Sequence, residues 1–406
     1  MATILSVVTL SPTAIEMPSG PKRDVAVDDY LTVELLCAGL AKIRLDRQHA
    51  LEGHVPDGRD PSAGLLPRAW RTGFTRLWWV GHHQSVNWPQ DDLDVLAACR
   101  LPLGEWPVRL ALSGADLDQS LLEGDELSEF SEQASALAAK TDVEAELVEN
   151  QIFAQLLATA QANGRTEEEV QRAYVELRLM HIRNPVLSDL DVLRRAQQMP
   201  AAGTSGEPHF KQLVHTAYRF QQAPGGAALR VCGSCGNPMP GVDRSCQVPG
   251  CQGSAVQKSL RTVEGYWVQH RATRRFHHDP GLVEARIFDA INTLPKDLVR
   301  LEEYPGLDAW DGAVWFRQPG SDQAECWLFD AKDCVSATLL GRRFTCDRRL
   351  RAVHRFLVMA NHRATPAYFA DLGRELDGRV NGVEVVDEDT FIRRVTKRSR
   401  EVGQHA

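Results

Sequence analysis

Residues 302–334, EEYPGLDAWDGAVWFRQPGSDQAECWLFDAKDC, decide the fold of the C-terminal part of the chain. A turn-forming QPGSDQ segment separates two β-rich runs, 313–316 and 326–331, and this pattern predicts a β-hairpin. In such a hairpin the start of the first strand lies near the end of the second. We therefore expect Asp311 to lie beside Asp330.

The second run ends in a pair of charged residues. Side chains alternate along a strand, so Asp330 and Lys332 share one face, roughly 6–7 Å apart. Burying an acid and a base at the end of an apolar strand is costly without partners. A metal ion with a phosphate is one explanation, and a simple ion pair at a strand end is the other. Asp308 replaces Asp311 as the neighbouring acid if the hairpin register differs.

A helix is predicted upstream of the hairpin, over 282–294. Asp279 followed by Pro280 is a typical helix start. Glu284 occupies the first position of an otherwise apolar face formed with Ile287, Phe288 and Ile291. A carboxylate on the core side of a helix indicates a functional role. His277 and His278 precede this helix, and we expect both to face solvent.

The remaining C-terminal sequence alternates between strand and helix patterns. We expect a strand at 355–360, a helix from Pro366 to about Leu376, a strand at 383–386 and a last helix from Asp389. Together with the hairpin, these elements predict a mixed α/β domain over 279–406.

Four cysteines upstream have the spacing of a metal site. Cys232 and Cys235 form one close pair, and Cys246 and Cys251 form a second. Four thiolates in two pairs suit a tetrahedral Zn²⁺ ion that is structural, since no ligand position stays open. The segment 206–278 resembles a zinc ribbon. The other five cysteines are expected to pack as small apolar residues: Cys37, Cys99, Cys326, Cys334 and Cys346.

The first half of the chain carries no recognisable chemistry. Residues 1–110 contain short β-rich runs such as SVVTL and RLWWVG and predict a small α/β domain. We expect Trp78 and Trp79 to pack in its core, the alternative being a binding surface with His82 and His83. Residues 111–205 are acidic and predict helices, including one from LLEGDELSEF onward, and 201–208 predicts a linker.

The composition is that of a soluble chain with several domains. It has 406 residues, 43 % of them hydrophobic and 25 % charged, and contains no run long enough to cross a membrane. Without a secretory signal, and with nine cysteines, it is expected in the reducing cytoplasm. The net charge is −8, yet 211–275 and 341–401 are net basic, as in proteins that contact DNA. No P-loop is present.

The acids and the lysine resemble the PD-(D/E)xK, or restriction-endonuclease-like, nuclease superfamily. The matching residues are Glu284, Asp311 and Asp330-Ala331-Lys332, whereas Trp310 stands where many members have proline. This resemblance implies an α/β/α domain with a central mixed sheet. The amino-acid sequence of 304–344 is also similar to that of a narrower group of nucleases. These nucleases have an upstream zinc ribbon and are encoded with RE-type prokaryotic PIWI proteins and a helicase in bacterial defence islands.

The resemblance implies Mg²⁺- or Mn²⁺-dependent hydrolysis of DNA phosphodiesters within a defence complex. Asp311 and Asp330 would hold the metal, helped by the Ala331 carbonyl and Glu284, and Lys332 would orient the attacking water. Four arginines would hold the DNA backbone: Arg342, Arg343, Arg348 and Arg349. The alternative function is a catalytically inactive zinc-ribbon adaptor that binds DNA and recruits partner proteins.

Overall fold

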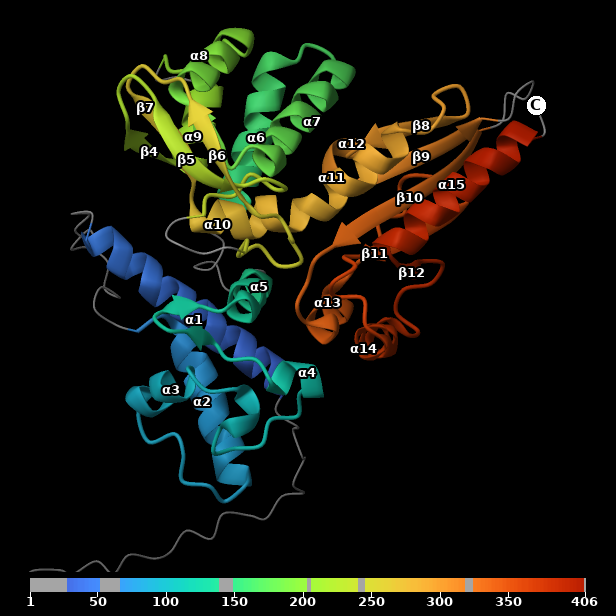
Figure 1. The fold of residues 1–406 in the computed structure, drawn as a ribbon. Helices are drawn as coiled ribbons and strands as arrows, with labels where there is room; N and C mark the ends of the chain where they lie inside the picture. The colour runs from blue at the N-terminus through green and yellow to red at the C-terminus, as the bar shows by residue number, and fades with distance from the viewer. Residues whose placement is uncertain are drawn as a thin grey trace, which may run out of the picture.

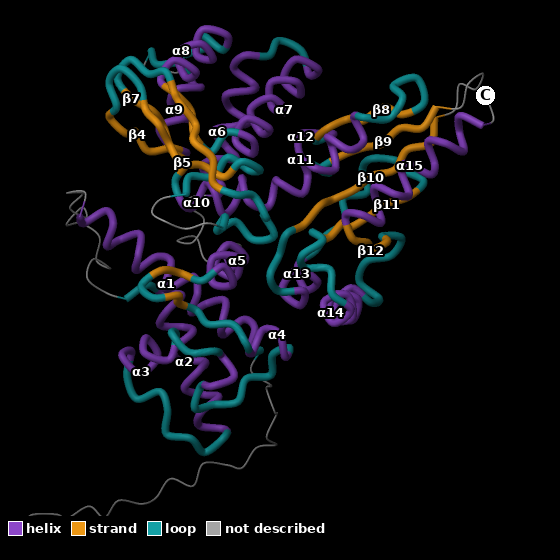
Figure 2. Tube along the Cα trace, viewed as in Figure 1, coloured by secondary structure: helices purple, strands orange, loops and turns teal. Residues whose placement is uncertain are grey.

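The computed structural model describes residues 28–51, 66–138, 149–202, 206–239, 245–317 and 324–404. The ribbon in Figure 1 shows N-terminal helices in blue and teal, a middle region in green and yellow, and a C-terminal sheet in orange and red. Strands concentrate in the middle and C-terminal regions (Figure 2). Among the described helices, none combines the length and apolar character that crossing a membrane requires.

The C-terminal region is built on a mixed five-stranded sheet in the order β12-β11-β10-β9-β8. Its strands are β8 (Val299–Glu303), β9 (Gly312–Arg317), β10 (Ala324–Lys332), β11 (His354–Met359) and β12 (Glu384–Asp387). The first three pair antiparallel, and β10, β11 and β12 pair parallel. The expected hairpin is therefore present as β9 and β10, in the middle of the sheet.

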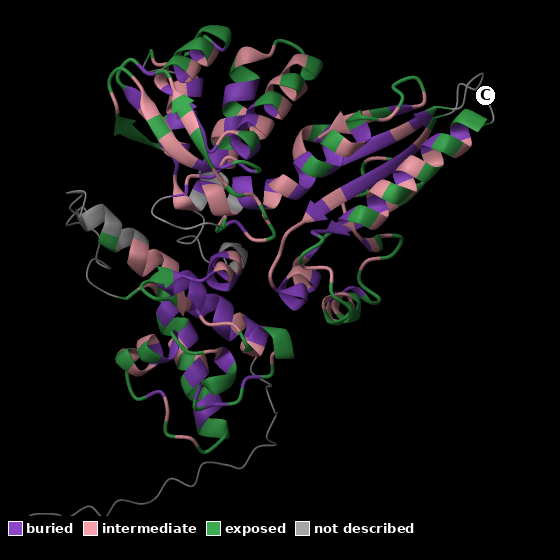
Figure 3. Cartoon of the chain, viewed as in Figure 1, coloured by how far each residue is buried: buried purple, intermediate pink, exposed green. Residues whose placement is uncertain are grey.

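Helices cover both faces of this sheet. They are α11 (Asp279–Asn292), α13 (Ala337–Arg343), α14 (Pro366–Leu376) and α15 (Glu388–Gln404). Phe356 and Val358 of β11 enter the core that contains α11 and α15, whereas Leu357 and Met359 pack with α13 and α14. This alternation produces three layers with the strands buried between them (Figure 3). The expected α/β/α arrangement is confirmed. Sequence patterns missed β8, which is half polar, and the short helix α13.

The middle region combines helices with a small antiparallel sheet. The helices are α6 (Glu149–Asn163), α7 (Glu167–Arg183), α8 (Asp189–Gln198) and α9 (His209–Ala217), and the strands are β3 (Val186–Ser188), β4 (Tyr218–Gln222) and β7 (Gly265–Gln269). The sheet order is β3-β7-β4, so strands on both sides of 201–208 pair with each other. A single apolar cluster continues from α6 and α7 to α11. The middle and C-terminal regions thus share a core.

The hairpin of β5 (Ala227–Cys232) and β6 (Ala255–Leu260) carries the cysteine cluster. Downstream, α10 (Arg271–Thr273) and a π-helical turn, η2 (Arg274–His278), run directly into α11. This continuity corrects the expectation for the two histidines before α11. His277 and His278 are only 2 % and 0 % exposed, because the turn packs against α7 instead of extending into solvent.

The described part of residues 1–110 is helical, which corrects the predicted N-terminal α/β domain. It contains α1 (Asp29–Leu51), α2 (Arg68–His83), α3 (Asp92–Ala98) and a single 3-10 turn, η1 (Leu103–Glu105). The run RLWWVG lies within α2, because Trp70, Gly73, Leu77 and Val80 repeat at helical spacing and bury one face. The run SVVTL lies outside the described residues.

Trp78 and Trp79 are not core residues. They are 43 % and 45 % exposed on the outer face of α2, and the Trp78 ring stacks on His82 with centroids 5.3 Å apart. The helical repeat explains this result, since the two residues that follow Leu77 in a helix point away from the buried stripe. The expectation of core packing was therefore wrong.

The acidic stretch after residue 110 also differs from the prediction. It begins with α4 (Gly114–Leu117), and a short hairpin of β1 (Leu122–Glu123) and β2 (Glu126–Leu127) precedes α5 (Glu129–Ala138). Gly124 adopts a φ of 64°, a left-handed conformation that ends any continuous helix there. The Thr166 side chain caps the start of α7 by accepting a hydrogen bond from the Glu169 N–H.

Candidate functional site

The β9–β10 register brings two acids together at one end of the sheet. Gly312 pairs with Phe329 at the end of the ladder, so Asp311 and Asp330 are the next residues along the two strands. The Ala331 N–H donates to Asp311 Oδ2 at 2.6 Å. Gly312 is required for this close approach, since an added Cβ would lie 2.3 Å from the Phe329 ring.

Lys332 lies between these carboxylates. Its Nζ forms an ion pair with Asp330 and lies 3.9 Å from Asp311 Oδ2. Burial alone would lower the pKa of Lys332, but the charges of Asp330 and Asp311 raise it above its usual value. The ammonium group therefore stays charged. It provides one cation within reach of two acids.

Glu284 approaches the same end of the sheet from α11. It is 4 % exposed and accepts a hydrogen bond from Tyr304 Oη at 2.5 Å. Arg178 of α7 lies 3.4 Å from its second carboxylate oxygen. Burial raises the pKa of Glu284, and the Arg178 charge opposes that shift. Glu284 is thus a core-facing acid, and its partners come from outside α11.

The structure distinguishes the two alternative acids before β9. Asp308 accepts a hydrogen bond from Tyr174 Oη at 2.9 Å, so its side chain is engaged by α7. Asp311 instead contacts the end of β10. Burial raises the pKa of Asp311 well above its usual range; Lys332 opposes this shift, whereas the negative charges of Glu284 and Asp330 add to it. Asp311 is therefore the acid placed next to Asp330.

The carboxylates differ from the cysteines in how closely they are gathered. In the described part of the chain, Cys232, Cys235, Cys246 and Cys251 are the one group of three or more His, Cys, Asp or Glu residues whose ligand atoms all lie within 4.8 Å of one another. Asp311 and Asp330 offer the hard oxygen ligands that suit Mg²⁺ or Mn²⁺. They are bridged here by the Lys332 ammonium group.

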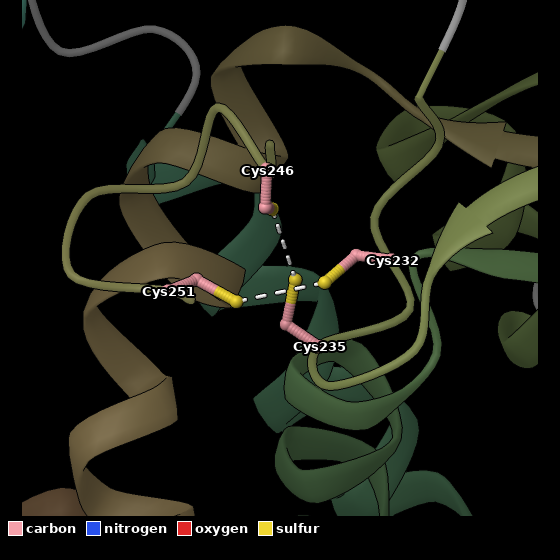
Figure 4. Close-up of side chains that lie close together, drawn as sticks. All are labelled: Cys232, Cys235, Cys246 and Cys251. Carbon is pink, nitrogen blue, oxygen red and sulfur yellow. Dashed lines mark hydrogen bonds between the residues drawn. The ribbon is translucent and has the colours of Figure 1, made fainter. Parts of the chain in front are cut away.

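The four sulfur atoms converge from two loops (Figure 4). Cys232 and Cys251 Sγ lie 3.6 Å apart, as do Cys235 and Cys246 Sγ. Tetrahedral Zn–S bonds of about 2.3 Å require sulfur separations of roughly 3.8 Å, so the thiols fit a zinc ion. Burial opposes ionisation of Cys232, but backbone N–H groups together with the neighbouring thiols lower its pKa to about 7, whereas burial raises the pKa of Cys235 and of Cys246.

The cysteine cluster lies against the helix that carries Glu284. Leu282 of α11 packs on the apolar shell of the cluster. An added Cβ at Gly250 would lie 2.2 Å from His362 Nδ1, so the second cysteine loop also closely approaches the segment after β11. The cysteine cluster therefore sits at the junction of the β5–β6 hairpin and the C-terminal domain.

Two of the four arginines expected to hold DNA phosphates are engaged elsewhere. Arg342 pairs with Asp28 and Arg343 with Glu34, both on the N-terminal region beside or within α1. These pairs link α13 to that region. Arg348 donates to the Asn381 carbonyl, and Arg349 pairs with Asp347.

Sequence patterns missed the partners of Glu284 and Asp308. Tyr174 and Arg178 lie on α7, more than a hundred residues before the acids that they contact. Their helical spacing with Gln171 indicates only a buried face. Nothing in a single sequence pairs that face with 303–308.

A mixed sheet with helices on both faces, and with two acids and a lysine at the ends of adjacent strands, has the layout that the resemblance to restriction-endonuclease-like nucleases implies. Residues 281–403 match the family model described as "REase associating with pPIWI_RE". Residues 64–188 match a second model, "pPIWI_RE three-gene island domain Y". The two matches support an REase-like protein in a pPIWI_RE island. No curated protein and no solved structure matches it.

Proposed function

We propose that the chain is a metal-dependent DNA endonuclease that hydrolyses phosphodiester bonds within a bacterial complex that acts against phages or plasmids. The observation that supports this most is the position of Asp311 beside Asp330, with Lys332 between them. The match of residues 281–403 to a restriction-endonuclease family model adds independent support. A PIWI-type protein, which both family-model descriptions mention, and a helicase, which the sequence resemblance implies, are the proposed protein partners.

In the proposed mechanism, Asp311 and Asp330 would hold a Mg²⁺ or Mn²⁺ ion, helped by the Ala331 carbonyl and Glu284. When bound, this ion supplies charge to polarise the phosphoryl group and to lower the pKa of a water. Lys332 orients the attacking water and offsets the negative charge that develops on the phosphate. The ammonium group can do so because it already lies within reach of both carboxylates.

The cysteine cluster has a structural role in this proposal. Its four thiolates would hold Zn²⁺ with no open ligand position, so they add no catalytic group. The cluster would instead fix the β5–β6 hairpin against α11 through Leu282. Zinc binding and cleavage can therefore be tested separately.

One observation favours a second function, a zinc-ribbon adaptor that binds DNA without cutting it. Lys332 pairs directly with Asp330, and the acids are not gathered as closely as the cysteines. The same arrangement is expected for a stable ion pair in a domain that is catalytically inactive. Both functions predict DNA binding, whereas only the nuclease predicts cleavage.

A plasmid-nicking assay with Mg²⁺ or Mn²⁺ distinguishes the two functions. We expect Asp330→Ala and Lys332→Ala to abolish cleavage while DNA binding in a gel-shift assay survives. Asp289→Asn is the matched control, because its carboxylate is 67 % exposed on α11 and pairs with Arg183. Cleavage at the wild-type rate by the two site variants would falsify the assignment of the site. Binding without any cleavage by the wild-type chain and its island partners would favour the adaptor.

A further inference from the structure

One face of α7 contacts the segment that leads into the candidate site. Gln171, Tyr174 and Arg178 are separated by three and four residues, so they lie on the same side of the helix. This helix belongs to the region that matches domain Y, not to the region that matches the nuclease model. Its contacts therefore join two parts of the chain that the family models treat separately.

The contacted segment, 304–308, contains the single turn α12 (Pro305–Asp308) and has an unusual backbone. Tyr304, Leu307 and Asp308 have φ values of 49°, 55° and 73°, and Gly306 has a φ of 68°. Residues with a side chain rarely adopt this left-handed conformation, and they keep it only where the surroundings hold it. Three of them in one short loop require an external support.

The side chain of Gln171 supplies part of that support. Its amide nitrogen donates to the carbonyl oxygens of Glu303 at 3.2 Å and Tyr304 at 2.7 Å. Its amide oxygen accepts a hydrogen bond from the Leu307 N–H at 3.1 Å. One side chain thus binds three backbone groups on both sides of Gly306. Tyr174 adds the hydrogen bond to Asp308 described above.

Arg178 connects the same face of α7 to the acids. Its guanidinium group pairs with Glu284 and lies 5.7 Å from the centre of the Tyr304 ring. Tyr304 donates through its hydroxyl to Glu284 and through its N–H to the Asp311 carbonyl at 2.9 Å. Tyr304 is fully buried, and the Arg178 side chain is only 11 % exposed. The contacts therefore form one water-excluded chain from α7 to Glu284 and Asp311.

We propose that the face of α7 formed by Gln171, Tyr174 and Arg178 is a positioning element of the nuclease site. It holds the 304–308 loop in its left-handed conformation and thereby fixes Asp311 and Glu284 relative to β10. Domain Y would then be a working part of the enzyme and not only a module attached to it. This inference rests on the proposed function, because it assigns α7 a role in the same site.

The test compares Arg178→Met, Arg178→Lys and Gln171→Ala in the full-length chain with Arg172→Met. Arg172 is exposed on the same helix, so it is a matched control. Two quantities are measured: kcat and KM for Mg²⁺-dependent plasmid cleavage, and amide hydrogen exchange over 303–311. The exchange measurement does not depend on catalytic activity. If Arg178→Met folds poorly, Gln171→Ala still tests the inference, because it leaves the buried Arg178–Glu284 ion pair intact.

We expect Arg178→Met and Gln171→Ala to lower kcat about 10- to 100-fold with little change in KM, since small displacements of reacting groups have effects of this size. Both should speed exchange over 303–311, Arg178→Lys should recover part of the loss, and Arg172→Met should behave as wild type. Wild-type kcat together with unchanged exchange would overturn the inference. If the wild-type chain does not cut DNA, the proposed nuclease function fails. Amide hydrogen exchange over 303–311 then decides the positioning role by itself. Faster exchange in Arg178→Met and Gln171→Ala supports that role, and unchanged exchange rejects it.

Discussion

Replacing Asp311 by asparagine should abolish cleavage and yet stabilise the fold at neutral pH. The carboxylate is 6 % exposed, and burial raises its pKa well above the usual range. The native carboxyl therefore holds a proton more tightly than the unfolded one. Its contribution to stability is lost as the pH rises above the unfolded pKa, because ionisation is then easier in the unfolded chain. Asparagine carries no charge and can still accept the hydrogen bond from Ala331.

The size of this effect follows from the charges around Asp311. At an effective dielectric constant of about 20, two unit charges 4 Å apart interact by about 4 kcal/mol. Lys332 Nζ lies 3.9 Å from Asp311 Oδ2, so this value is the upper limit of the attraction that Asp311→Asn removes. Lys332 keeps its ion pair with Asp330 in the variant. The lost attraction is also opposed, because the substitution removes the cost of burying a charge and the repulsion between Asp311 and the acids Asp330 and Glu284. Substitutions that relieve such strain commonly add about 0.5–2 kcal/mol. A gain of about 1 kcal/mol raises the melting temperature of a domain by roughly 2–4 °C.

Thermal unfolding of Asp311→Asn and wild type, measured at about pH 8 and about pH 5, checks this prediction. The gain should shrink at the lower pH, because keeping the buried carboxyl protonated costs less free energy as the pH approaches the pKa of the unfolded chain. Added Mg²⁺ should stabilise only the wild type, because the variant lacks a ligand. No chelator is used, since it would also strip zinc. The exposed control, Asp289→Asn, should change little. A lower melting temperature for Asp311→Asn at about pH 8 would refute the reasoning.

Three further perturbations test other parts of the structure. Cys235→Ser should remove one zinc per chain in metal analysis, whereas Cys346→Ser, outside the cluster, should retain it. Gly312→Ala should lower the free energy of unfolding by about 1–3 kcal/mol in a denaturant titration, because the added methyl group overpacks the site. Gly373→Ala on α14 should raise it by about 0.5–1 kcal/mol, because the added methyl group meets open space and alanine favours a helix. Equal effects of the two substitutions would contradict the packing argument. Burial lowers the pKa of His278 to about 4, whereas a histidine in the unfolded chain titrates near about 6.5. The free energy of unfolding should therefore fall as the pH drops below about 6.5. His278→Gln should reduce this fall in thermal melting curves.

Local patterns were sufficient for much of the candidate site. The turn between two apolar runs predicted the β9–β10 hairpin, and strand alternation put Asp330 and Lys332 on one face. Helical spacing placed Glu284 on the buried side of α11, and the cysteine spacing predicted the sulfur cluster. These features depend on residues close in sequence, where backbone geometry alone decides which side chains share a face.

Other features depended on packing between distant segments. The buried face of α2 outweighed the β-propensity of its Trp-rich run, and η2 packed His277 and His278 inside. Arg342 met an acid of the N-terminal region, and Arg178 met Glu284 across more than a hundred residues.

The sequence by itself thus determined which residue types share a strand, a helix face or a metal-binding loop. Only the tertiary structure decided which of these surfaces meet, because burial and charge pairing between distant segments depend on how whole elements pack.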